Sequence, residues 1–298
     1  MRRLSLVALA VAVMSLVVAW PAAAQSSNRS VYVSVNDDEG KGVPDLTSAD
    51  FELKEGGRDR AILSVEPASA RMRMAILVEE SLTPTGGVRM GLAEFIRRMQ
   101  PHAEMALVVV GLRNTTVVDY TTDIGALFAG INSFSLNRHQ QSNNVPEGVY
   151  EAAKKFEQER PERPVIVVVA QELMQASSEN PQNVLNQIRR SGALVQVVTV
   201  ESGSFNVAVG NLNEMSGRAQ VLGDGSKQSG GERIEVTALT GVSRALQQVA
   251  DRLTNQYRIT YELPPGVKPS ERLEVDIKRS GLTMRAPTRI SASMADAR

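Results

Sequence analysis

The stretch AILVEESLTP, residues Ala75 to Pro84, runs from an apolar segment straight into a polar one. Apolar runs that do not alternate with polar residues are typical of strands buried on both faces of a parallel sheet. Ligands of an open α/β sheet bind beyond the carboxyl ends of such strands. We therefore expect Glu79 and Glu80, followed by Ser81 and Thr83, to lie at the carboxyl end of a central strand that faces a crevice.

Three further apolar runs follow this one, with amphipathic stretches of helical periodicity between them. The runs are Met105–Leu112, Pro164–Gln171 and Ala193–Val200. The predicted helices cover Val88–Met99, Gly148–Glu159, Pro181–Arg190 and Thr240–Asn255, and Asn180 is placed to cap the third. This alternation predicts an α/β domain with a doubly wound, mostly parallel sheet of the Rossmann-like class over residues 72–256.

Short strands with two-residue alternation flank the α/β region, over residues 31–68 and 257–292. Each segment is too short to bury a core unaided. We expect the N-terminal and C-terminal segments to pair into one small antiparallel β module. The glycine-containing stretch Gly223–Gly231 predicts a flexible surface loop, because it matches no phosphate-binding motif.

The N-terminus combines Arg2 and Arg3, an apolar run and the small residues Ala22 and Ala24. This pattern predicts a signal peptide over residues 1–24, with a disordered leader over 25–30. The alternative is an uncleaved membrane anchor, since the apolar run is about 20 residues long and would just span a bilayer. Either interpretation places the remainder outside the cytoplasm, in the periplasm or secreted.

Composition narrows the classes of partner and of chemistry. The 33 basic residues balance the 33 acidic ones, so no electrostatic attraction to nucleic acid or to an anionic membrane is expected. The chain contains no cysteine, which excludes disulfides, zinc thiolates and thiol nucleophiles. An exported protein without disulfides fits a bacterial envelope.

Glu79, Ser81 and Thr83 stand at alternate positions ahead of a glycine turn. This spacing resembles the Asp-x-Ser-x-Ser loop of von Willebrand factor type A domains, their metal-ion-dependent adhesion site, with Glu in place of Asp. The N-terminal segment resembles that of a bacterial family of such proteins, in which an apolar strand leads to D-x-x-G, P-x-L-T-x-x-D-F and a glycine-rich hairpin. NQYRITYEL and RLEVDIKRSGLTMRAP resemble that family's C-terminal segment. The resemblance implies a von Willebrand type A fold and protein binding.

The resemblance also implies ligands from two further loops, and the chain departs from the family pattern in both. Residues 142–144, where the family has a Thr, read Ser-Asn-Asn, and the residues after VIVVVA are Gln171 and Glu172 instead of Asp. We therefore interpret the adhesion site as degenerate. The interaction rim that we expect around it comprises Arg138, Asn143, Gln171 and Glu172.

The expected cofactor is either none or weakly bound Mg²⁺ or Mn²⁺ at Glu79, Ser81 and Thr83. A carboxylate and two hydroxyls are hard oxygen donors that suit these ions. The extra methylene of Glu works against Mg²⁺, which tolerates little geometric slack. Alternatively, Glu79 and Glu80 cap a following helix or face solvent.

These features predict an exported, non-catalytic protein-binding module with a protein partner in the envelope or the extracellular space. One alternative is a structural envelope component that self-assembles through its sheet edges. A less favoured alternative is a hydrolase that uses Ser81, which would need a base within hydrogen-bond reach. Neither His102 nor His139 is placed at a neighbouring strand end that would bring it to Ser81, so no catalytic residue is predicted.

Overall fold

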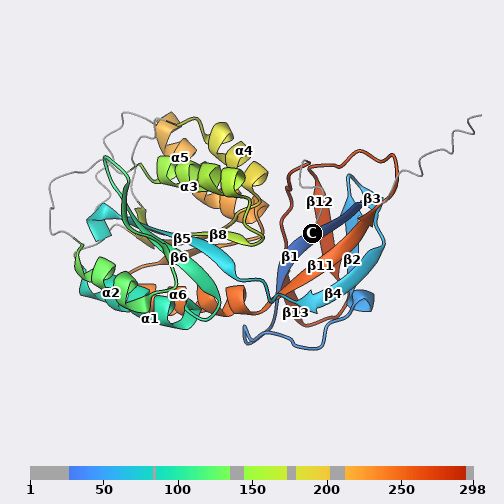
Figure 1. Cartoon of the computed structure of the whole chain (residues 1–298), viewed down its shortest axis with the longest axis horizontal. Coiled ribbons are helices and arrows are strands. Elements are labelled where there is room, and N and C mark those ends of the chain that lie inside the picture. Colours follow the sequence, from blue (N-terminus) through green and yellow to red (C-terminus); the bar gives the residue numbers. More distant parts are fainter. Residues whose placement is uncertain (1–26, 83–84, 135–143, 173–178, 202–211, 293–298) are drawn as a thin grey trace, which may run out of the picture.

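The computed structural model describes residues 27–82, 85–134, 144–172, 179–201 and 212–292, without the side chains of residues 172 and 212–216. Two bodies lie side by side, an α/β domain and a smaller β module (Figure 1). Two short stretches of chain link them, between residues 67 and 72 and between residues 254 and 256.

A six-stranded sheet forms the centre of the α/β domain, with the order β10-β9-β8-β5-β6-β7. Neighbouring strands are parallel except for β7, which runs antiparallel to β6 at the edge. The inner strands are buried on both faces, as their unbroken apolar runs predict. The strands are β5 (Met72–Glu79), β6 (Ala103–Val110), β7 (Thr115–Thr121), β8 (Pro164–Glu172), β9 (Leu194–Glu201) and β10 (Arg233–Val236).

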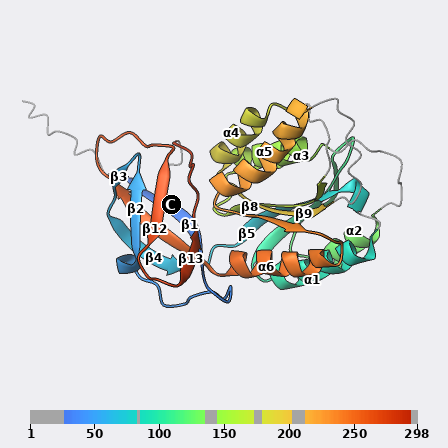
Figure 2. The same cartoon turned by 180° about the vertical axis from the view of Figure 1, so that it is seen from behind.

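Helices cover both faces of this sheet (Figures 1 and 2). One face packs against α1 (Gly86–Met99), α2 (Ile124–Asn132) and α6 (Gly241–Thr254). The opposite face packs against α3 (Val145–Glu159), α4 (Pro181–Ser191) and α5 (Leu212–Gln228). In the described part of the chain, none of the helices combines the length and the apolar character needed to span a bilayer.

The order of the strands reverses next to β5. From β5 the chain proceeds outward through β6 and β7, and it returns through α3 to β8 on the other side of β5. The point of reversal therefore lies between β5 and β8, and in a doubly wound sheet the ligand crevice forms at the carboxyl ends of the two strands that flank it. The prediction that the strand before Glu79 is central is confirmed.

Helix ends in the α/β domain follow from local sequence. The side chain of Asn180 accepts a hydrogen bond from Gln182 N at 2.8 Å, and Pro181 opens α4. Gly192 ends the same helix in the left-handed conformation, with a φ of 67°. The cap that the sequence predicts at Asn180 is thus confirmed.

The β module contains two antiparallel sheets, ordered β13-β1-β11-β4 and β12-β2-β3. Strand β1 pairs with β11 and β2 pairs with β12, so segments from both ends of the chain share one core. This confirms the predicted fold class, an α/β domain with an antiparallel β module. The elements are β1 (Ser27–Asp37), the 3₁₀ turn η1 (Ser48–Asp50), β2 (Phe51–Glu55), β3 (Arg58–Asp59), β4 (Ile62–Pro67), β11 (Gln256–Leu263), β12 (Leu273–Ile277) and β13 (Leu282–Arg285).

The predicted disordered leader over residues 25–30 is wrong from Ser27 onward, where β1 begins. Ser27 is paired with Leu263 of β11, and the Ser30 hydroxyl lies 3.1 Å from that of Thr260. Arg29 is buried and forms an ion pair with Glu55. The polar composition that suggested a mobile segment instead reflects a strand whose polar side chains have specific partners.

The predicted loop over Gly223–Gly231 is also wrong for most of its length, because α5 continues to Gln228. Its small residues allow close helix packing. A Cβ at Gly225 would lie 3.0 Å from Ile188 Cδ1 of α4. The helix ends just before Gly230, which has a φ of 85°.

Arg163 joins the two bodies beside the linking stretches. Its Nη2 donates to Leu253 O and to Gln256 Oε1, each at 2.6 Å, and its Nη1 donates to Ala70 O at 3.2 Å. Gln256 in turn donates to Ser34 Oγ of β1 at 3.2 Å. Burial lowers the pKa of Arg163 to about 10. Since Arg163 immediately precedes β8, the β module docks at the amino edge of the parallel sheet and leaves the carboxyl edge at the far end of the molecule.

Candidate functional site

The candidate site lies at the carboxyl ends of β5 and β8, on either side of the point where the strand order reverses. Glu79 is the last residue of β5 and is in register with Val110 of β6, while Val78 is in register with Val169 of β8. The Glu79 side chain is fully buried, with 0% of its surface exposed. The sequence therefore places this carboxylate at the correct edge, but the expectation that it opens into a crevice is wrong.

The carboxylate of Glu79 is paired with the guanidinium of Arg218, which reaches it from α5. Arg218 Nη2 lies 3.2 Å from Glu79 Oε2 and donates to Gln171 O at 2.7 Å. The backbone N–H of Gln171 donates to the same Oε2 atom. With 4% of its side chain exposed, Arg218 is almost as buried as its partner. A compact polar knot thus joins the ends of β5 and β8 to α5.

The sequence resemblance implies a divalent cation at Glu79, and the position of Arg218 shows whether such an ion would fit there. A cation bound to Glu79 Oε2 at the ~2.1 Å typical of Mg²⁺ would lie within about 5 Å of Arg218 Nη2. At that separation and an effective dielectric constant of ~20, the repulsion between a divalent ion and a guanidinium is about 7 kcal/mol. No cluster of three or more His, Cys, Asp or Glu side chains placed to hold a metal occurs among the described residues. The residues at the strand end fit an internal ion pair, and they do not fit a divalent cation beside it.

The loop after Glu79 separates the other predicted ligands from the carboxylate. Residues Glu80–Leu82 form a 3₁₀ turn, η2, in which Ser81 is exposed and Leu82 is buried. The Glu80 side chain lies over Gly111 at the end of β6, where a Cβ would come within 2.3 Å of Glu80 Oε2. Gly111 is therefore required for this close approach. Thr83, the third predicted ligand, lies outside the described residues.

The predicted interaction rim is described in part. Gln171 is half-buried and contributes both of its backbone polar groups to the knot around Glu79. Glu172 ends β8 in register with Glu201 of β9. Arg138 and Asn143, like the side chain of Glu172, lie outside the described part of the chain. The rim thus remains a prediction at these positions.

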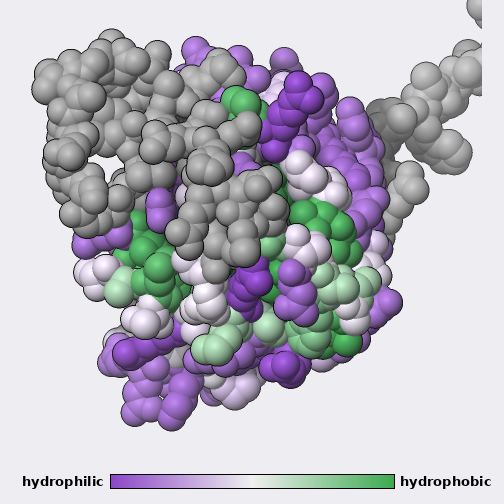
Figure 3. Space-filling model, turned by 90° about the vertical axis from the view of Figure 1, so that its left-hand side faces the viewer, coloured by the Kyte–Doolittle hydropathy of each residue, from purple (hydrophilic) through white to green (hydrophobic). Residues whose placement is uncertain are grey.

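Two exposed apolar side chains stand near the same edge of the sheet. Leu112 follows the carboxyl end of β6 and is 50% exposed, and Met90 in the second turn of α1 is 65% exposed. Asn144, at the start of α3, donates from its backbone to Gly111 O and from its side chain to Leu112 O, each at 3.3 Å. Figure 3 shows the molecule from this side, with apolar surface in green among polar surface in purple.

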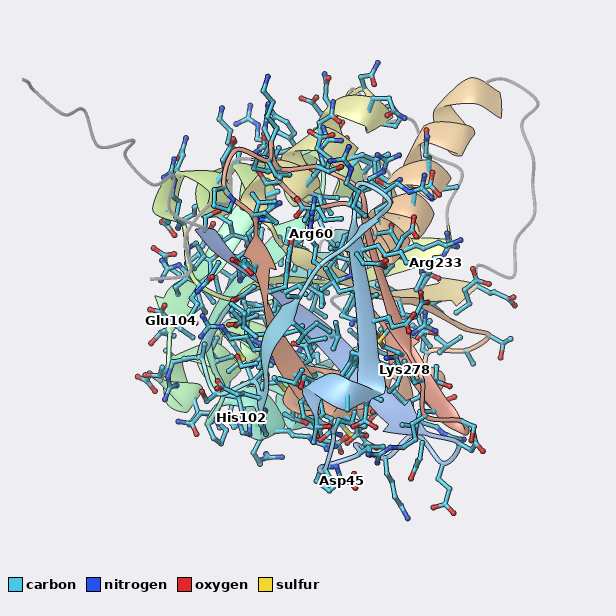
Figure 4. The ribbon with its side chains drawn as sticks, turned by 90° about the vertical axis from the view of Figure 1, so that its right-hand side faces the viewer. Asp45, Arg60, His102, Glu104, Arg233 and Lys278 are labelled. Carbon is cyan, nitrogen blue, oxygen red and sulfur yellow. The ribbon has the colours of Figure 1, made fainter. Side chains whose placement is uncertain are left out.

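The histidines do not complete a catalytic group with Ser81 in the described residues. His102 immediately precedes β6 and lies at its amino end, near Glu104 and on the side of the β module (Figure 4). Ser81 follows the carboxyl end of the adjacent strand, so the eight residues of β6 separate the two, a length of roughly 26 Å. His139 lies outside the described residues. The geometry does not favour a hydrolase built on Ser81 and His102.

Comparison with known proteins shows likeness at the level of fold. The von Willebrand domain of the type V pilus tip protein Mfa5 from Porphyromonas gingivalis matches with 9% identity and a TM-score of 0.47, covering 62% of this chain and 96% of that one. BatB from Bacteroides thetaiotaomicron matches with 14% identity and a TM-score of 0.42, covering 62% and 98%. Proximal thread matrix protein 1 from the mussel byssus, solved with zinc in its adhesion-site motif, matches with 11% identity and a TM-score of 0.47, covering 67% and 49%.

The α/β domain is similar in fold to von Willebrand factor type A domains. In this chain, the domain has a six-stranded sheet with one antiparallel edge strand and helices on both faces. This chain spans about half the length of the mussel protein. No family model and no curated protein sequence matches it.

Sequence reasoning missed Arg218, although a signal for it is present. In a helix, Arg218, Val221 and Leu222 share one face, because they are spaced at i, i+3 and i+4. Val221 and Leu222 belong to the core. An arginine on a core-facing stripe is a buried charge that requires a carboxylate partner. Treating residues 223–231 as a loop concealed the helix that carries this pattern.

Proposed function

We propose that this protein is an exported, non-catalytic protein-binding module that contacts a protein partner through the carboxyl edge of its α/β domain, without an obligatory divalent cation. The observation that carries the proposal is the exposed Leu112, which follows the carboxyl end of β6, the strand next to the one that ends at the paired Glu79. In this class of fold, the same edge is where ligands bind. A partner would find an exposed apolar contact at an edge where the Glu79 carboxylate is buried and already paired.

Rigidity of the edge supports this proposal. Arg218 and Gln171 connect the ends of β5 and β8 to α5, while Asn144 connects the end of β6 to α3. Binding residues are commonly carried on loops that a rigid scaffold positions. A pre-organised edge loses less conformational entropy on association than a flexible one. These contacts support the proposal of a binding surface that does not need an ion to assemble it.

The self-assembly alternative is less well supported by the edge strands. Leu63 on the edge strand β4 is 51% exposed, which would suit pairing with a second copy. However, the pairing of β4 with β11 shifts register next to Leu63, and β4 ends at Pro67. Bulges and prolines are features that protect an edge strand from further pairing.

A pull-down from envelope extract would test the proposal, with the full chain as bait. The change Leu112→Lys should lower the amount of retained partner at least about tenfold, since a charge in the apolar centre of an interface costs 1.4 kcal/mol or more. Leu63→Lys is the matched control, because Leu63 is equally exposed but lies on the β module. EDTA should not release the partner.

Two results would contradict the proposal. Equal losses for Leu112→Lys and Leu63→Lys would remove the carboxyl edge from the interface. Release of the partner by EDTA, followed by its recovery with Mg²⁺ or Mn²⁺, would show that binding depends on a cation.

A further inference from the structure

We propose that the guanidinium of Arg218 takes the place of a divalent cation at Glu79, so that the strand-end site is assembled by the chain itself and is closed to Mg²⁺ and Mn²⁺. This inference concerns the site named in the proposed function. It does not depend on a partner, because its tests measure stability and metal binding of the protein alone.

The hydrogen bonds to Glu79 leave no room for a metal bond at Oε2. A carboxylate oxygen has two lone pairs. Glu79 Oε2 accepts one hydrogen bond from the backbone N–H of Gln171 and one from Arg218 Nη2. A cation bound at Oε2 would have to displace at least one of these donors, and the displaced donor would be left buried.

Arg218 also makes the connection that a shared ion would make. A bound cation holds separate segments together by accepting oxygen ligands from each of them. Arg218 Nη2 contacts the carboxylate at the end of β5 and the carbonyl of Gln171 in β8, from its own position on α5. A planar guanidinium with several fixed donors suits this role better than a flexible lysine would.

The charges of the Glu79–Arg218 pair are balanced without an ion. Glu79 contributes one negative charge and Arg218 one positive charge. Glu80 is directed over Gly111 towards the end of β6. A divalent ion added to this pair would therefore meet the Glu79 carboxylate with a positive charge already beside it. The change Arg218→Met removes this positive charge. It should therefore open the site to a divalent ion.

The test compares thermal unfolding midpoints with and without Mn²⁺ or Mg²⁺, in buffers matched for ionic strength with NaCl. We expect no shift for the wild-type protein. Arg218→Met should have a lower midpoint than the wild type and should gain several degrees from Mn²⁺. The double change Arg218→Met with Glu79→Gln also removes the negative charge, and Gln keeps the shape of Glu, so this variant should gain nothing.

Calorimetric titration of the wild type with Mn²⁺ provides a second measurement. No binding heat supports the proposal, and heat that disappears in Glu79→Gln overturns it. A folded Arg218→Met protein that gains nothing from either ion also overturns it. If Arg218→Met does not fold with or without Mn²⁺, Arg218→Lys decides: stabilisation of that variant by Mn²⁺ overturns the proposal, and insensitivity supports it.

Discussion

Each of the two bodies contains a fully buried glutamate that is paired with arginine. The two pairs lie in different places in the fold and differ in their roles. Glu55 of the β module pairs with Arg29 and lies 3.9 Å from Arg60 Nε, and it accepts a hydrogen bond from Ser270 N at 2.8 Å. Glu79 pairs with Arg218 alone among the arginines of the described residues. Both sites are glutamate–arginine pairs, so Glu55 and Glu79 differ in their position in the fold and not in the type of interaction.

Glu55, Arg29 and Arg60 form a buried charged cluster in the β module, here called the Glu55 cluster. Arg29 stands near the start of β1 and also donates to Ser291 O, so the cluster fastens both ends of the described chain to β2. Arg60 belongs to the same body (Figure 4). In contrast, Glu79 lies at the carboxyl edge of a parallel sheet, where the fold provides a ligand site. The same chemistry stabilises the core of the β module in one place, and in the other it stands where we propose a binding surface.

The largest effect should come from breaking the Glu55 cluster. Glu55→Gln removes the carboxylate that faces the buried Arg29 and Arg60, which should lower the free energy of unfolding by about 4–5 kcal/mol. Denaturant unfolding followed by circular dichroism would measure the change. Glu52→Gln, on the same strand but 55% exposed, should change stability by no more than about 0.5 kcal/mol. Similar small losses for the two variants would show that the cluster does not stabilise the core of the β module.

A somewhat smaller loss of stability is expected when the pair of Glu79 and Arg218 is broken. Glu79→Gln and Arg218→Met should each lower the free energy of unfolding by about 3 kcal/mol, because each leaves one charge buried. The double variant should lose less than the sum of the two, with a coupling free energy of about 2 kcal/mol. Chemical denaturation of all four proteins without divalent ions would complete the cycle. Additivity within about 0.5 kcal/mol would mean that the two groups do not interact as the structure describes.

The smallest effect on stability should come from a change beside Asp119, whose carboxylate is exposed, unlike those of Glu55 and Glu79. The backbone N–H of Tyr120, and secondly Lys155, hold the pKa of Asp119 below its usual value. The stabilisation from this depressed pKa is complete above about pH 4, the region of the unfolded pKa, and is lost as the pH falls through the folded pKa. Lys155→Met should therefore raise the pKa of Asp119 and weaken the acid sensitivity. An NMR titration of the Asp119 carboxylate that showed no change would contradict this.

The comparison also shows why one part of the site was predictable and the other was not. Glu79 follows an unbroken apolar run, so its position at a strand end can be read from adjacent residues. Arg218 is 139 positions away, and its pairing with Glu79 depends on how α5 packs across the sheet. The glycines of α5 resembled a loop in the sequence because their packing partner, α4, is known only from the fold.

The sequence by itself determined the layers of this protein. Unbroken β-branched runs bury both faces of a strand, and alternating segments at the two ends bury one, so the periodicity of side chains predicts a parallel sheet and an antiparallel module. Only the tertiary structure decided what meets Glu79, because a buried charge selects its partner by distance in space. That partner is a guanidinium from a remote helix, and it turns a loop that resembles a metal site into one that carries its own cation.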